Sequence, residues 1–310
     1  PVRHVPYNNP LFYLSPSNHF AVAAQQKYCF CVNFVLIFRH AFLMQPNISC
    51  DMTKSMENYI ANIDLSVLMF ATFSGLTAGL VKGVVGFGMP MILLSSLAIF
   101  MPIHTALAAL ILPTLLTNLQ QAREQGLNRA TPLISNHKIF IVAMVILIFT
   151  SALLTPRLPQ QFFLGILGIF IVSFSIFQMS GYRFSLSAGN HCTQFVFGSI
   201  AGVAGGLCGA FGPPTVAYLT AINTPKNEQM KLQALIYGTG ATLMFFGHMT
   251  SGIFNLSTAP LSGFLIIPCV FGFWIGSRIR NTFDQNMFRK VTLVLLIIVG
   301  ANLIRRAWFM

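Results

Sequence analysis

Two short stretches are the most informative part of this chain: Gly83-Val-Val-Gly86-Phe-Gly88-Met-Pro90 and Gly205-Gly206-Leu-Cys-Gly209-Ala-Phe-Gly212-Pro213-Pro214. In each stretch a glycine-spaced apolar segment ends in a glycine-rich turn, and a proline then opens a short apolar segment. Glycine permits a sharp reversal of the backbone, and proline at the first position of a helix sacrifices no hydrogen bond. Both stretches therefore predict a helix, a tight turn and a second, short helix.

The two stretches belong to an internal repeat with an offset of 123 residues. Six of the sixteen positions from Gly75 to Pro90 are identical in the second copy. Further matching apolar segments begin near residues 104, 138 and 160 and near residues 229, 259 and 288. The short segments 90–101 and 213–222 would reach about 15–18 Å as helices, half of the hydrocarbon layer. We predict two repeats of five elements, each with a short half-membrane helix.

The composition is that of a membrane protein. Of the 310 residues 55% are hydrophobic and only 8% are charged, and the mean hydropathy is +0.72. In a soluble domain about a quarter of the residues are charged, and these residues coat its surface. The charges also cluster, so that the runs 83–122, 184–225 and 232–277 contain none. This pattern excludes an ordinary cytosolic enzyme and predicts an all-α protein that crosses a membrane several times.

The basic residues predict the orientation of the repeats. The connector 122–137 is basic and its repeat mate 249–258 carries no charge, whereas 157–159 carries one basic residue and its mate 279–289 is flanked by several. The connector 122–137 has Arg123 and Arg129, with Lys138 at its edge, and 157–159 has Arg157. The connector 279–289 is flanked by Arg278, Arg280, Arg289 and Lys290. Basic loops stay in the cytoplasm, so the pattern favours two inverted repeats. Arg305 and Arg306 would then lie outside, against this rule. The net charge of +12 thus reflects topology, and we expect no nucleic-acid partner.

A small anion site is predicted where the two Gly-Pro turns meet. The free amides and the dipole at a helix start favour an anion, and such backbone is tolerated in a bilayer only where it is buried or lines a cavity. The candidate substrate-binding residues are Gly86, Phe87, Gly88, Pro90, Gly209, Phe211, Gly212, Pro213, Pro214, Lys82 and Asn118. We take Gly75, Gly79 and Gly83 as helix-packing positions.

The charged and polar side chains near the turns leave alternatives open. Lys82 could extend to the membrane interface, or it could supply positive charge to the anion. Thr114, Thr117, Asn118 and Gln121 share one helix face and either line a pathway or bond across helices. Gln233, Tyr237 and Thr239 are weaker candidates, and His104 and His248 are expected at the interface. Past Asp64 the only acids are Glu124, Glu228 and Asp284, none inside an uncharged run, which argues against a cation carrier.

No catalytic or metal-binding constellation is present in the sequence. There is no H-E-x-x-H pattern, no nucleophile motif with a partner histidine and no buried acid pair. Cys29 and Cys31 form a lone C-x-C, and Cys208 and Cys269 are expected to pack as small apolar residues. We therefore expect no enzymatic activity, no metal and no cofactor.

The chain divides into three parts by these criteria: an N-terminal extension (1–63), a first transmembrane repeat (64–183) and a second one (184–310). Residues 1–55 differ in composition and show no clear signal peptide. Translated upstream sequence, with Met52 or Met56 as the start, and a disordered extension are both open for this part.

The segment from Gly75 to Pro90, repeated from Gly198 to Pro214, resembles the sulfite exporter TauE/SafE family of membrane permeases. The resemblance covers about residues 64–308, and the family's Gly-Pro pattern falls on Gly86, Gly88 and Pro90 and on Gly209, Gly212 and Pro213. Similar proteins are permeases linked to sulfite, thiosulfate, sulfoacetate and other sulfur-containing or organic anions, which implies an anionic substrate. The sequence departs from the family in its first 55 residues and at Met89, where small residues are common.

The function predicted from these observations is transport of a small anion, a sulfur oxyanion or an organosulfonate or carboxylate, by alternating access between inverted repeats. Its partners would be that anion and the lipid of a bacterial inner (plasma) membrane. The alternative is a membrane accessory or assembly protein that moves no solute.

Overall fold

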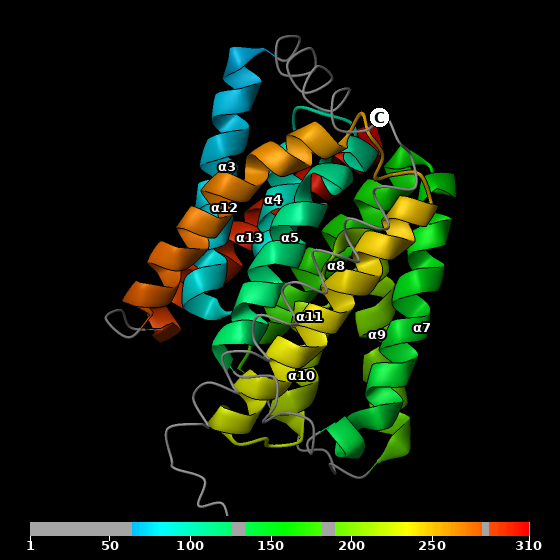
Figure 1. Cartoon of the computed structure of the whole chain (residues 1–310), viewed down its shortest axis with the longest axis vertical. Helices are drawn as coiled ribbons and strands as arrows, with labels where there is room; N and C mark the ends of the chain where they lie inside the picture. The colour runs from blue at the N-terminus through cyan, green and yellow to red at the C-terminus, as the bar shows by residue number, and fades with distance from the viewer. Residues whose placement is uncertain (1–63, 126–133, 182–189, 281–284, 310) are drawn as a thin grey trace, which may run out of the picture. The chain divides into compact units, whose positions relative to one another are not determined.

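A computed structural model describes residues 64–125, 134–181, 190–280 and 285–309, and the predictions for residues 1–63 lie outside them. These residues form ten α-helices and two short 3-10 helices, with no strand among them (Figure 1). The elements of the first half are α3 (Leu65–Val85), α4 (Met89–Leu97), α5 (Ile103–Gln125), η2 (Ser135–His137), α7 (Lys138–Leu154), η3 (Thr155–Arg157) and α8 (Gln160–Met179). Those of the second half are α9 (His191–Cys208), α10 (Gly212–Ala221), α11 (Lys226–Thr250), α12 (Ala259–Ile279) and α13 (Gln285–Phe309).

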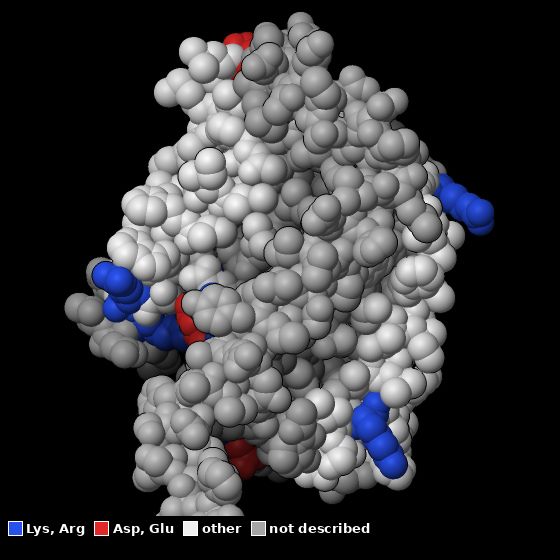
Figure 2. Space-filling view, in the orientation of Figure 1, with Lys and Arg blue, Asp and Glu red and all other residues white. Residues whose placement is uncertain are grey.

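Six helical segments of the described residues are long and apolar enough to cross a membrane. They are Leu65–Val85, Ile103–Gln125, Ser135–Arg157, Gln160–Met179, Ala259–Ile279 and Lys290–Phe309. Large apolar side chains on these helices point outward, and Phe73 and Ile267 are 65% and 73% exposed. On the face shown in Figure 2 the described surface is mostly uncharged, with Lys or Arg beside an acidic side chain at the left edge and a few other charged side chains apart from it. Such a surface suits lipid rather than water, so the prediction of an all-α membrane protein is confirmed.

Glycines let three pairs of helices approach closely. A Cβ on Gly79 of α3 would lie 2.2 Å from the Cys269 carbonyl oxygen of α12, and one on Gly206 of α9 would lie 2.3 Å from the Ile148 carbonyl oxygen of α7. Gly168 joins α8 to α13 in the same way, against the Gly300 carbonyl oxygen at 2.8 Å. Side chains at these positions would force the backbones apart, so the glycine stripes of α3 and α9 serve helix packing.

The two predicted short helices are present. α4 has nine residues and α10 has ten, so each is only about 13–15 Å long. Gly86 caps the end of α3 with a φ of +91°, and Gly209 caps the end of α9 with a φ of +70°, a backbone conformation that favours glycine. The prolines stand at the second position of each short helix rather than the first, because Met89 and Gly212 are already helical.

Candidate functional site

The two Gly-Pro turns, far apart in sequence, lie against each other. A Cβ on Gly209 would lie 3.1 Å from the Pro90 Cβ, and one on Gly212 would lie 3.1 Å from the Phe87 Cβ. A cavity of about 10 Å³ remains between them, which has room for the centre of about one water molecule. The turn before α4 and the turn before α10 therefore meet around one small cavity, where the sequence predicts an anion site.

Most of the predicted site residues line this cavity: Lys82, Phe87, Gly88, Pro90, Asn118, Gly209, Phe211, Gly212 and Pro213. The other two are buried beside it. The Gly86 carbonyl accepts a hydrogen bond from Gln121 Nε2 at 3.4 Å, and Pro214 is the third residue of α10.

The two helix starts offer different numbers of amide donors. An α-helix leaves its first amides without an intrahelical acceptor, but a proline has no amide to offer. In the first turn of α4 only Pro90 lacks an amide hydrogen, so Met89 and Met91 both carry free amides. In α10 both Pro213 and Pro214 lack an amide hydrogen, so Gly212 is the only residue of this helix before Thr215 that carries a free amide. The Thr215 amide donates to the Phe211 carbonyl at 3.4 Å. The start of α10 therefore acts on an anion mainly through its dipole.

Lys82 brings a positive charge to the edge of the cavity. Its side chain is only 2% exposed, so the alternative in which it extends to the membrane interface is wrong. Its Nζ donates to Thr117 Oγ1 at 2.8 Å and to Asn118 Oδ1 at 2.5 Å, and it lies 5.8 Å from the centre of the Phe273 ring. These partners are uncharged. A buried charge without an opposite charge is costly, so the arrangement favours an anion in the neighbouring cavity.

The polar face of α5 points toward this lysine. Thr117 and Asn118 bond across to α3, and Asn118 also lines the cavity, so this residue fits both roles left open by the sequence. Thr114 Oγ1 and Gln121 Oε1 are buried and have no hydrogen-bond partner within the described ranges. A buried hydroxyl or amide oxygen needs a hydrogen-bond partner, and a water molecule or a ligand can fill this role.

Three cavity residues were missing from the predicted set: Met91, Ala210 and Tyr237. Tyr237 was a weaker candidate, and it is fully buried, with its hydroxyl donating to the Gly212 carbonyl at 3.1 Å. Of the other weak candidates on α11, Thr239 is exposed and Gln233 is half-buried. Met91 and Ala210 are apolar, and only their position beside the Gly-Pro pattern marks them.

The structure places two histidines and two cysteines whose surroundings are predicted from the sequence. His248 is fully buried, so its predicted place at the interface is wrong, whereas His104 is half-buried. Cys208 and Cys269 are free and buried, which agrees with their expected role as small apolar residues.

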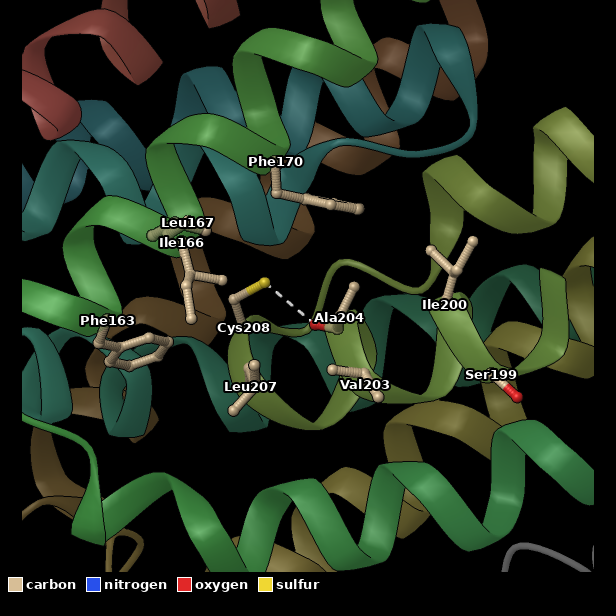
Figure 3. A pocket seen from close by; sticks show the side chains of 10 residues that line it. All are labelled: Phe163, Ile166, Leu167, Phe170, Ser199, Ile200, Val203, Ala204, Leu207 and Cys208. Carbon is tan, nitrogen blue, oxygen red and sulfur yellow. Dashed lines mark hydrogen bonds between the residues drawn. The ribbon is translucent and has the colours of Figure 1, made fainter. Parts of the chain in front are cut away.

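A second, larger pocket of about 330 Å³ lies between α8 and α9 (Figure 3). Its walls include Phe163, Ile166 and Phe170 on α8 and Ile200, Val203 and Leu207 on α9. No charged side chain lines it, and Cys208 Sγ at its edge donates to the Ala204 carbonyl at 3.0 Å. A wall of this composition suits hydrocarbon and does not suit a small anion.

Comparison with known proteins identifies the family. The family model described as "Sulfite exporter TauE/SafE" matches residues 71–303, which is well over half of the chain and includes both Gly-Pro turns. Searches of curated proteins and of solved structures returned no match. Proteins of the matched family are transporters, not enzymes. The chain therefore belongs to the sulfite exporter TauE/SafE family of membrane permeases.

Proposed function

We propose that this protein moves a small anion across a membrane and binds it between the starts of α4 and α10. The observation that carries the proposal is Lys82: a buried cation whose contacts are all uncharged, at the edge of a cavity where two helix starts meet. An anion there would interact with the lysine charge and with both helix dipoles, in surroundings of low dielectric constant.

We propose that residues 64–183 and 184–310 are inverted repeats. The packing of α3 on α12 and of α9 on α7 supports this, because each pair joins the first long helix of one half to the fourth helix of the other. The close approaches correspond as well, since Gly83 meets the Phe273 carbonyl as Gly206 meets the Ile148 carbonyl. Reciprocal contacts are expected of two halves related by a two-fold axis in the membrane plane.

The transport mechanism that we propose is alternating access around this site. The cavity is too small for a sulfur oxyanion, so the two turns must separate before a substrate can enter or leave. The glycines bring the backbones of each helix pair into close contact, which favours movement of whole helix pairs over local rearrangement.

The substrate class follows from the chemistry of the site. One lysine, a few backbone amides and the Asn118 amide suit an oxyanion of small radius, such as sulfite, thiosulfate or the head group of an organosulfonate or carboxylate. The description of the family as sulfite exporters supports the first of these. We place the protein in the inner (plasma) membrane of a bacterium.

A ligand panel followed by flux measurements tests this proposal. Detergent-purified protein would be heated with sulfite, thiosulfate, methanesulfonate, sulfoacetate, acetate and chloride. We expect one of the sulfur anions to raise the melting temperature, because a ligand that binds only the folded state stabilises it. The same anion, radiolabelled, should then enter proteoliposomes. An accessory protein would give neither a shift nor flux with any member of the panel.

Substitution of Gly209 by alanine tests the close contact of the two turns. The new Cβ would lie 3.1 Å from Pro90 and 3.3 Å from the Met244 sulfur, and the φ of +70° would be strained. Crowding of this kind costs about 1–3 kcal/mol, so we expect flux of the labelled anion to fall roughly tenfold or more.

Gly252→Ala is the matched control, since Gly252 has a φ of +81° and its Cβ would meet nothing within 4 Å. It reproduces the backbone strain away from the site and should transport like the wild type. Equal flux in the two variants would contradict the assignment of the turns. A substitution of Gly86 does not test the contact between the turns, because a Cβ at this position would also meet nothing within 4 Å.

A further inference from the structure

His248 is a buried titratable residue that the proposed anion site does not use. It lies near the end of α11, and its side chain is fully shielded from solvent. Neither Nδ1 nor Nε2 has a hydrogen-bond partner among the described residues. A buried polar group without a partner is rare in proteins and points to a role, a water molecule or an ion.

The ring lies close to the proposed anion site. Met244, one helical turn before His248 on α11, approaches the Cβ position of Gly209 to 3.3 Å, and Gly209 lines the cavity. One turn of helix is about 5.4 Å. The ring also lies beside the backbone of Gly206, one turn before Gly209 on α9, although the geometry is not that of a hydrogen bond. His248 is thus one helical turn from Met244, whose sulfur borders the cavity on the side of Gly209.

Few titratable or charged groups face this ring from the elements packed against α11. α5 contributes His104, whose Nε2 lies 3.2 Å from the Thr155 carbonyl. On α9 the titratable group is Cys208, which lines the pocket toward α8 and whose thiol donates to the Ala204 carbonyl. Arg157, in η3 after α7, is exposed. On α10 the titratable group is Tyr218, which is bonded to His137 at 2.8 Å.

No carboxylate of the described residues approaches the ring, since their acids lie exposed at helix ends: Asp64, Glu124 and Glu228. A positive charge on His248 would therefore have no fixed counter-charge in these parts of the protein. The anion in the cavity would be its nearest opposite charge.

We propose that His248 binds the proton that accompanies the transported anion. The inference rests on the proposed function and adds the coupling ion to it. When the anion occupies the cavity, one free ring nitrogen takes a proton from water, and the two opposite charges stabilise each other where water does not screen them. When the anion leaves, the charged ring loses this stabilisation and returns the proton to the water on that side. No covalent bond other than the N–H bond forms or breaks.

Proton uptake on ligand binding tests this proposal directly. Thiosulfate is the probe, because it does not itself titrate near neutral pH, and methanesulfonate replaces it if thiosulfate gives no thermal shift. Either anion is added to weakly buffered, detergent-purified protein with a pH indicator. We expect the wild type to take up roughly one proton per bound anion, because a single imidazole titrates. Binding without proton uptake would overturn the proposal.

Two variants assign the proton to this residue. His248→Gln keeps a polar side chain of similar size but cannot titrate, so it should bind the anion without proton uptake. His191→Gln is the matched control, since His191 is exposed at the start of α9, and it should behave as the wild type. If His248→Gln is unstable, His248→Asn replaces it. Proton uptake by the glutamine variant equal to that of the wild type would refute the assignment.

Flux measurements separate failure of this inference from failure of the proposed function. In proteoliposomes a pH gradient should drive net uptake of the labelled anion at least tenfold faster in the wild type than in His248→Gln. Exchange of labelled for unlabelled anion without a gradient should differ by less than about threefold, because exchange needs no net proton movement. Net uptake that ignores the pH gradient in the wild type, with exchange intact, would overturn the coupling and leave the anion site intact. Absence of exchange in the wild type would overturn both.

Discussion

Lys82→Met is expected to abolish anion binding and transport while the protein stays as stable as the wild type or becomes more stable. The lysine is buried among uncharged partners, so its charge is a cost to folding that methionine removes. The same charge attracts the anion and so increases its binding affinity. At an effective dielectric constant of about 20, two charges about 4 Å apart attract by about 4 kcal/mol, so we expect affinity to fall by roughly 100-fold or more.

Two measurements on the same protein check this expectation: the melting temperature without ligand and the rise in melting temperature with thiosulfate or sulfite. Lys82→Met should keep the first and lose the second. Lys138→Met, at the exposed start of α7, removes a lysine far from the cavity lining and should keep both. If Lys82→Met still shows the ligand-induced rise, the lysine is no part of the anion site. A large fall in its unliganded melting temperature would mean that the lysine charge serves the fold.

Gly272→Ala is expected to cause the largest loss of stability. Its Cβ would lie 2.2 Å from the Leu76 carbonyl oxygen and 2.9 Å from the Leu80 amide nitrogen, both backbone atoms of α3. Because backbone cannot rotate away as a side chain can, α12 and α3 would have to separate along much of their contact. Overpacking costs about 1–3 kcal/mol even where side chains can adjust, and we expect a loss of about 3 kcal/mol or more here.

The same helix offers a matched control. A Cβ on Gly263 of α12 would meet nothing within 4 Å. Gly263→Ala should be neutral or stabilise the protein by about 0.5–1 kcal/mol, because alanine favours the helix more than glycine does. Thermal unfolding in detergent and the fraction of monodisperse protein after extraction measure both effects. Similar melting temperatures for the two variants would show that the α3–α12 contact is looser than the structure indicates.

The short helices and their turns could be predicted because local rules determine them. Glycine at positions 86 and 209 permits the positive φ that ends each preceding helix, and a proline after each turn favours the start of a new one. The prediction erred by one position at each proline, because local patterns place helix ends less well than helices.

Charges and histidines were harder to place. Lys82 stands near the end of a predicted span, where exposure and burial are equally compatible with the sequence. Its burial follows from α5 and α12, which bring Thr117, Asn118 and Phe273 around the amine. His248 was expected at the interface for the same reason of position, but its surroundings on α9 and α5 bury it.

Composition, periodicity and backbone preference act within a few residues of chain, so the class of protein, its helices and the Gly-Pro turns could be predicted from local sequence. The duplication of the two halves stays a prediction. Helix packing alone established that the two turns meet, that Lys82 and Tyr237 reach their cavity and that His248 is buried. These facts depend on which helix packs on which, and that choice is made by the sum of close contacts such as those of Gly79 and Gly206, which join residues more than 50 positions apart.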